Sequence, residues 1–380
     1  MKALVAFALL FSGATLIMSA TQVSQDIDGT PDYRASVKDS YRKLQIKASI
    51  YSTLPEKGSG IRLGIYQAQA KSGTGASSAN MDRLEKAVAE ATKYNVQLLA
   101  FPELYVPGYT LNPDEAKKVA EFKDGRSISR ACKIAAKNKM ALLVPYAEKV
   151  KDINGELKYY DSIAVINEEG KLLNSYKKTH LYGQQERDNW SPGSGPYEVY
   201  SIYDFPVAVL NCYECEFPEL SRILALKGAK LIVGPTAADN YYRLPNGKRS
   251  SVPYPDVATT LFPANAYANN IFFAYANRCG YEARGGDSWH YRGNSVVYGP
   301  HGDAIVAANH EQDTLVIADC IPAYYGMTHP APSYYYLKDR RPELYGELTT
   351  NTVQFDAIKP TEIDLKTRFT NKTYVYPEAK

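Results

Sequence analysis

Residues 207–220 read VAVLNCYECEFPEL, and this stretch predicts a strand that turns sharply into a helix. The apolar run 207–210 indicates a buried strand, and residues 219–227 have a helical pattern closed by Gly228. Cys212 falls in the turn, where such an elbow exposes a side chain and directs a helix N-terminus towards it. A helix N-terminus and a nearby lysine both lower the pKa of a thiol. Cys212 is therefore either a reactive thiol or, as is commonest for an isolated free cysteine, a buried packing residue.

Strand and helix patterns alternate on both sides of this elbow. Strands are expected at 61–67, 98–101, 141–148, 161–167, 172–176, 207–210, 231–233, 271–276, 294–298, 304–307 and 315–319, and helices at 80–94, 127–138, 219–227 and 256–269. Two β-α-β-α-β cycles with hairpins predict an α/β fold in which helices cover two sheets.

The composition excludes several classes of protein. The 380 residues carry 44 basic and 41 acidic side chains, a balance too even for a nucleic-acid or membrane-surface footprint. Five cysteines are too few for a dense disulfide scaffold, and the odd count leaves at least one thiol unpaired. Tyrosine is abundant, with 32 residues against 11 phenylalanines, which is typical of aromatic surfaces and interfaces.

The N-terminus has the pattern of a targeting segment. A lysine at position 2 precedes an apolar run, and small residues follow up to Ala20, as in a secretory signal peptide. We expect cleavage near Ala20 and export to the periplasm or the medium; an uncleaved membrane anchor is the alternative. Residues 21–59 are polar and predict a linker or N-terminal arm. In an exported protein, Cys132, Cys279 and Cys320 could supply at most one disulfide.

Two further motifs also follow predicted strands. Phe101-Pro-Glu103 places a carboxylate at the carboxyl end of strand 98–101, where α/β sheets usually hold ligands, although a surface or helix-capping glutamate is the simpler interpretation. Tyr176-Lys-Lys178-Thr-His180 follows strand 172–176, and a lysine pair is usually solvated. Neither motif identifies a site by itself.

Taken in order, Glu103, Lys178 and Cys212 resemble the nitrilase superfamily of carbon–nitrogen hydrolases. Weaker matching stretches lie at Tyr66-Gln67, Gly108-Tyr109, Ser191-Pro-Gly193, Gly234-Pro-Thr-Ala237, Tyr275-Ala-Asn277 and Gly299-Pro300. The resemblance implies a four-layer α-β-β-α sandwich at 60–345, with a C-terminal tail at 346–380 and assembly as a homodimer or higher oligomer.

The resemblance implies a role for each residue of the site. Cys212 would attack the substrate carbonyl, Glu103 would serve as general base and then acid, and Lys178 would hold the oxyanion with the backbone N–H of Tyr213. No metal or cofactor is needed. Glu186 stands eight residues after the lysine, where the family carries a supporting glutamate. Supporting or substrate-binding roles are expected for Tyr109, Thr236 and Ala237.

The residues around Cys212 indicate which substrates of the superfamily are expected. The Cys212-Tyr213 pair is commoner in amidases than in nitrilases, and the surrounding pattern resembles the 5-aminopentanamidase-like branch. The expected substrate is a small linear aliphatic amide, with or without an ω-amino group, which yields an acid and ammonia; Asp239, Asn240 or Glu282 could hold an ammonium. The alternatives are a nitrilase or N-carbamoyl amine hydrolase with the same triad, a non-catalytic binding protein, and a redox protein using Cys212 and Cys215.

Overall fold

The computed structural model describes residues 44–243, 248–284, 287–328 and 333–350. By its contacts the chain divides into two units, residues 1–42 and 43–380, and all the described residues belong to the second. The expected signal peptide at 1–20 and the last part of the tail lie outside the described residues. Among the described residues, no helix combines the length and apolarity needed to cross a membrane.

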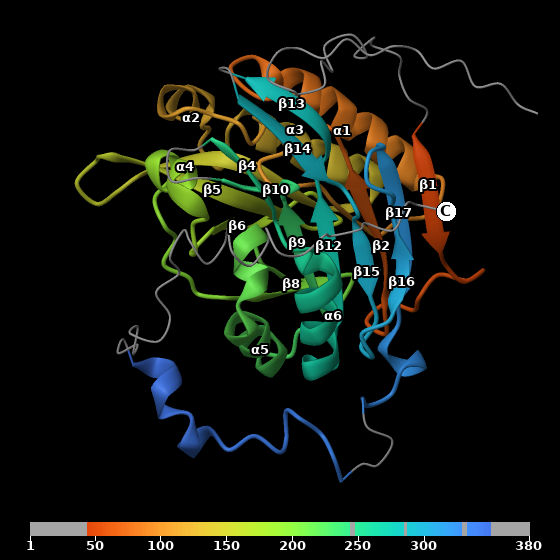
Figure 1. The fold of residues 1–380 in the computed structure, drawn as a ribbon. Helices are drawn as coiled ribbons and strands as arrows, with labels where there is room; N and C mark the ends of the chain where they lie inside the picture. The colour runs from red at the N-terminus through yellow and green to blue at the C-terminus, as the bar shows by residue number, and fades with distance from the viewer. Residues whose placement is uncertain (1–43, 244–247, 285–286, 329–332, 351–380) are drawn as a thin grey trace, which may run out of the picture. The chain divides into compact units, whose positions relative to one another are not determined.

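Two mixed sheets form the centre of this unit (Figure 1). The first has the order β1 (Gln45–Ser49), β17 (Thr314–Cys320), β2 (Ile61–Gln67), β3 (Leu98–Ala100), β4 (Ala141–Lys151), β5 (Leu157–Ile166) and β6 (Leu172–Lys177). The second has the order β16 (Ala304–Ala307), β15 (Val296–Tyr298), β12 (Phe272–Asn277), β9 (Leu231–Thr236), β8 (Phe205–Val209) and β7 (Val199–Ile202). Strands β2, β3 and β4 are parallel, as are β8, β9 and β12.

Helices cover the outer face of each sheet. The helices α1 (Ala76–Thr92) and α3 (Arg126–Asn138) pack on the first sheet, and α5 (Pro218–Leu226) and α6 (Val257–Asn269) pack on the second. Strand residues alternate between the two sides: Leu231 and Val233 face the core between the sheets, whereas Ile232 faces the helices. This period of two is what a strand buried on both faces requires, and it confirms the expected α-β-β-α sandwich.

Smaller elements surround one end of the sheets. They are the helices α2 (Pro113–Val119) and α4 (Gly183–Asn189) and the hairpins β10 (Tyr241–Arg243)–β11 (Arg249–Pro253) and β13 (Cys279–Arg284)–β14 (Asp287–Arg292). The sequence patterns did not predict these elements. They also missed β1, which lies within the expected arm and pairs in parallel with β17. Gln45 and Lys47 give this edge strand a polar sequence.

The topology brings the three motifs to one place. Strand β6 is antiparallel to β5, which is antiparallel to β4, so β6 runs in the direction of β3. Glu103 and Lys178 follow the carboxyl ends of β3 and β6, and Cys212 follows the end of β8 in the other sheet. The backbone N–H of Glu103 donates to the Thr236 carbonyl at 3.3 Å, which joins the two sheets at this end.

Candidate active site

Lys178 is the centre of a fully buried charged cluster. Its Nζ lies 2.5 Å from Glu103 Oε1, 2.8 Å from Glu186 Oε2 and 3.8 Å from Asp161 Oδ2. Glu103 and Lys178 have no exposed surface, and Glu186 and Asp161 are each 1% exposed. Burial would lower the pKa of Lys178, but the surrounding negative charges raise it well above its usual value. The lysine therefore stays an ammonium.

Cys212 lies at the tip of the elbow between β8 and a short 3₁₀ helix, η2 (Cys212–Glu216). Its backbone is left-handed, with φ 53°, a conformation that costs a non-glycine residue ~1–3 kcal/mol. The neighbouring Asn211 holds the turn through a capping box with Glu214, whose Oε2 accepts from the Asn211 N–H at 2.7 Å. Cys212 is partly exposed as a residue, whereas Glu103, Lys178, Glu186 and Asp161 are buried.

Glu214 ties the elbow to the segment that carries the lysine. Its carboxylate accepts hydrogen bonds from Tyr176 Oη at 2.7 Å and from the Thr179 N–H at 2.6 Å. Because Lys178 lies between these two donors in the chain, the buried Glu214 fixes its position relative to Cys212. The sequence patterns did not predict that Glu214 would connect the elbow to the segment that carries Lys178.

The pKa of Cys212 contradicts the expectation of a thiol activated at rest. Burial and the charge of Glu103 raise it well above the usual value, and the Lys178 charge and the Ala237 backbone N–H offset this only in part. The short η2 helix and one lysine do not outweigh desolvation and two carboxylates. The resting nucleophile is therefore a neutral thiol, which needs a base to take its proton during attack.

The remaining predicted site residues surround this cluster. Tyr109 Oη donates to Glu186 Oε1 at 2.8 Å, and the Tyr182 N–H donates to Glu186 Oε2 at 2.7 Å, so Glu186 is held on both oxygens. Thr236 contacts Glu103 through its carbonyl, as described above. Its neighbour Ala237 directs an N–H at the thiol, and Tyr213 packs edge-to-face on the ring of Tyr182 at 5.4 Å. The structure thus brings together all eight predicted residues.

The three carboxylates also form a set that could bind a cation. Oxygens of Glu103, Asp161 and Glu186 lie within 4.8 Å of one another. However, the Lys178 ammonium already lies within hydrogen-bonding distance of Glu103 and Glu186. It takes the place that a metal ion would occupy, so the residues present do not fit a metal as well as they fit this ammonium.

The two acids expected to bind a substrate ammonium, Asp239 and Glu282, are engaged elsewhere. Asp239 pairs with Arg243 at 2.5 Å, and Glu282 accepts hydrogen bonds from Thr110 and Tyr291. The Asn240 N–H donates to the His290 carbonyl. These contacts stabilise the two hairpins rather than leaving a charge for a ligand.

A different carboxylate, Glu216, lies in η2 four residues after Cys212 and is near aromatic side chains. Its Oε1 accepts from Tyr254 Oη at 2.7 Å, and Tyr254 packs edge-to-face on Tyr182 and Tyr242. Burial raises the pKa of Glu216, while the Tyr254 hydrogen bond and the charge of Lys178 lower it. The charge of Cys212 in turn contributes to the raised pKa of Tyr182, after burial. The sequence patterns did not single out Glu216, although an acidic residue four positions after Cys212 was visible in the motif.

Cys215 is a packing residue. It is fully buried, its Sγ lies 3.7 Å from the Leu210 carbonyl, and a Cβ added to Gly234 would come within 2.5 Å of this sulfur. All five cysteines are free. The thiol of Cys215 thus packs closely against Gly234 in β9, as expected of a core cysteine rather than of a redox partner.

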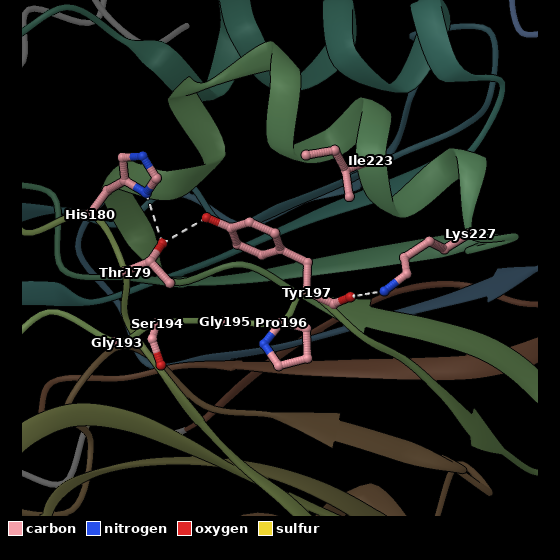
Figure 2. Close-up of a pocket in the computed structure, with 9 residues that line it drawn as sticks. All are labelled: Thr179, His180, Gly193, Ser194, Gly195, Pro196, Tyr197, Ile223 and Lys227. Carbon is pink, nitrogen blue, oxygen red and sulfur yellow. Dashed lines mark hydrogen bonds between the residues drawn. The ribbon is translucent and has the colours of Figure 1, made fainter. Parts of the chain in front are cut away.

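A cavity of about 570 Å³ begins in the chain at Thr179, the residue after Lys178, and Figure 2 shows the residues that line it. Its lining includes Thr179, His180 and Tyr197, and Figure 2 shows the Thr179 hydroxyl bonded to both His180 and Tyr197. Lys178 and Cys212 are not among the lining residues. The cavity therefore does not hold the catalytic residues, and His180 acts in its lining as a hydrogen-bond partner of Thr179.

The fold and the cluster define a hydrolase of the carbon–nitrogen hydrolase class. The sequence profile of the carbon-nitrogen hydrolase family matches residues 62–329, and the chain belongs to this family. The match covers both sheets apart from β1 and the first residue of β2, and it includes every residue of the cluster. The chain is accordingly an enzyme of the nitrilase superfamily that acts on carbon–nitrogen bonds.

Similar proteins fall in the same family. The chain is 33% identical over 270 residues to the "Hydrolase in pqqF 5'region" of Pseudomonas protegens, covering 71% of this chain and 86% of that protein. It is 29% identical to the citrullinase of Francisella tularensis, covering 71% and 92%. Among solved structures, a mutant amidase from Nesterenkonia sp. AN1 has a TM-score of 0.57 at 29% identity, covering 77% and 98%. That structure shows the acetamide moiety of fluoroacetamide added covalently at the active-site cysteine.

Proposed function

We propose that this enzyme is an amidase that converts a small linear aliphatic amide to the carboxylic acid and ammonia through a thioester on Cys212. The observation that carries the proposal is a free cysteine at the tip of the elbow, beside a buried glutamate and a buried ammonium that are 2.5 Å apart. The covalent cysteine adduct of the similar Nesterenkonia amidase supports it.

The first half of the reaction forms the thioester. Glu103 takes the Cys212 proton as the sulfur attacks the amide carbonyl, and the new S–C bond leaves a negative charge on the oxygen. The C–N bond then breaks as the nitrogen takes the proton back from Glu103, and ammonia leaves. Glu103 is suited to both roles because it is buried beside Cys212, Lys178 binds its Oε1, and its Oε2 keeps a lone pair that can take the proton.

The second half regenerates the enzyme. Water attacks the thioester and gives a proton to Glu103; the C–S bond breaks, the acid is released, and the sulfur recovers the proton. Lys178 and the Tyr213 N–H stabilise the oxyanion in both halves, and one such donor is typically worth about 3 kcal/mol. Glu186 positions Lys178 through its 2.8 Å contact and is itself fixed by Tyr109.

The experiment is a comparison of short aliphatic amides, nitriles and N-carbamoyl amines, with ammonia and carbon dioxide both measured. An amidase releases ammonia from amides alone. Carbon dioxide from a carbamoyl substrate, or acid and ammonia from a nitrile, would favour the alternative, a nitrilase or N-carbamoyl amine hydrolase with the same triad. Wild-type enzyme inactive on the whole panel would contradict the proposal.

Glu216 predicts a preference for amides that carry an ω-amino group. A carboxylate bordered by the rings of Tyr182 and Tyr254 is a suitable partner for an ammonium, which gains from both the charge and the aromatic faces. Glu216→Gln should raise the KM for 5-aminopentanamide about tenfold, the value of one charge-assisted hydrogen bond, with little change in kcat. Pentanamide, which has the same length and no charge, is the control. Equal changes for both amides would exclude this role.

The targeting segment at 1–20, export and the homo-oligomeric state stay predictions from the sequence. Cell fractionation tests the first two, and size-exclusion chromatography with light scattering tests the third.

A further inference from the structure

Three buried carboxyl groups surround the single ammonium of Lys178. If Glu103, Asp161 and Glu186 were all ionised beside a neutral Cys212, the cluster would carry a net charge of −2 without solvent. Burying an uncompensated charge is strongly unfavourable, and carboxylates whose oxygens lie within 4.8 Å of one another do not all ionise. At least one of the three must therefore hold a proton at neutral pH.

Asp161 contacts both the lysine and the residue that precedes the nucleophile. It lies on β5, and its carbonyl accepts the Lys178 N–H at 2.9 Å, which extends the β5–β6 ladder by one step. Its Oδ1 accepts from Asn211 Nδ2 at 2.9 Å, and Asn211 directly precedes Cys212. The mechanism above gives Asp161 no role, although it contacts both sides of the site.

The unpartnered oxygens of the cluster indicate where the proton lies. Asp161 Oδ2 and Glu103 Oε2 are both buried and have no hydrogen-bond partner among the described residues. Asp161 Oδ2 lies 3.8 Å from the lysine nitrogen, beyond hydrogen-bonding distance. A proton on Asp161, directed at Glu103, would give partners to both carboxyl groups. Burial, followed by the charge of Glu103, raises the pKa of Asp161 well above its usual value, which agrees with this geometry.

We propose that Asp161 is a positioning residue that is protonated at neutral pH, donates to the Glu103 carboxylate and accepts from Asn211, so that it aligns the base with the nucleophile. This inference rests on the proposed thiol mechanism. With Lys178 and protonated Asp161 both donating to it, Glu103 remains an anion within a buried site and is ready to take the Cys212 proton. The groups that face Asp161 are Glu103, Lys178 and Glu186.

Asparagine is the matched replacement for a protonated aspartate. In Asp161→Asn the amide oxygen still accepts from Asn211 and the amide N–H still donates to Glu103, whereas Asp161→Ala removes both contacts. The reactivity of Cys212 is measured at pH 7 as its rate of alkylation by iodoacetamide, followed by mass spectrometry, together with kcat/KM on an amide.

We expect Asp161→Asn to stay within about threefold of wild type and Asp161→Ala to fall at least about tenfold, because a lost hydrogen bond leaves buried polar groups unpaired. Asp188→Asn, the same change at an exposed residue of α4, is the control and should match wild type. If Asp161→Asn loses as much as Asp161→Ala, Asp161 acts as an anion and the inference is overturned.

Stability tests the protonation without any activity. A carboxyl group whose pKa is raised by folding stabilises the fold fully below its unfolded pKa of about 3.9, and this contribution is lost as the pH rises. The wild type must take up a proton on folding at pH 8, and Asp161→Asn need not. The Tm of the variant relative to wild type should therefore increase from pH 5 to pH 8. A relative Tm that does not increase over this interval would indicate an ionised Asp161, which titrates below pH 5, and would overturn the inference.

The two proposals fail in different ways. Cys132 is the other partly exposed cysteine among the described residues and serves as an internal reference for alkylation. A wild-type Cys212 that reacts no faster than Cys132 would count against the thiol mechanism. The pH dependence of the Tm would still decide whether Asp161 is protonated.

Discussion

Ammonia release is expected to fall by at least about 10⁴-fold in Cys212→Ala, because no other group at the elbow can form the covalent intermediate. The thiol lies at the strained tip between β8 and η2, beside Glu103, and the described residues place no second nucleophile there. Wild-type enzyme mixed with an amide and quenched in acid should carry an acyl group on the peptide that contains Cys212. The variant should carry none.

Cys215→Ala is the matched control for this prediction. Cys215 is three residues further along, fully buried and packed against Gly234. The variant should lose some stability, of the order of 1 kcal/mol for a small core cavity, and keep its turnover within about threefold. Equal loss of turnover in both variants would indicate that the two thiols act together, as in a redox protein. Unchanged turnover in Cys212→Ala would rule out the thioester.

The sequence was sufficient to predict the sandwich and the position of the three central residues. Glu103, Lys178 and Cys212 each follow a strand, and parallel strands bring their carboxyl ends together. Local patterns of residues predicted the strands and the elbow, and the resemblance to the nitrilase superfamily implied the four-layer sandwich and the grouping of the three residues. The hairpins β10–β11 and β13–β14 were missed because they depend on contacts between residues far apart in the chain, such as Arg243 over the ring of Trp289, which no local pattern shows.

The electrostatics of the site could not be predicted in this way. The motifs placed a lysine and a helix start near Cys212, and both lower the pKa of a thiol. The opposing effect comes from burial and from Glu103 and Glu186, whose distances depend on the whole fold. Asp161 was missed for the same reason. It lies inside a predicted strand, and only the pairing of β5 with β6 places it next to Lys178.

Lys178→Met is expected to reduce kcat/KM by about 10²–10³-fold and also to destabilise the fold. The loss of activity follows from removal of the oxyanion donor, since a single such donor is worth this much in other hydrolases. The loss of stability follows from the 0% exposure of the lysine and from the carboxyl groups that it neutralises. Removing one partner from a buried ion pair typically costs ~3–5 kcal/mol.

The pH dependence separates the electrostatic cost of this substitution from loss of packing. Without the ammonium, Glu103, Glu186 and Asp161 must fold as neutral acids, so their folded pKa values lie above the unfolded values of about 4. Groups of this kind stabilise the fold below pH 4 and progressively less as the pH rises. Urea unfolding should therefore show a larger deficit for Lys178→Met at pH 8 than at pH 5. Lys177→Met is the control, because this neighbouring lysine is partly exposed, pairs with Glu148 at 3.4 Å and should contribute no more than ~1 kcal/mol. A deficit that is the same at both pH values would mean that packing, and not charge, accounts for the buried lysine.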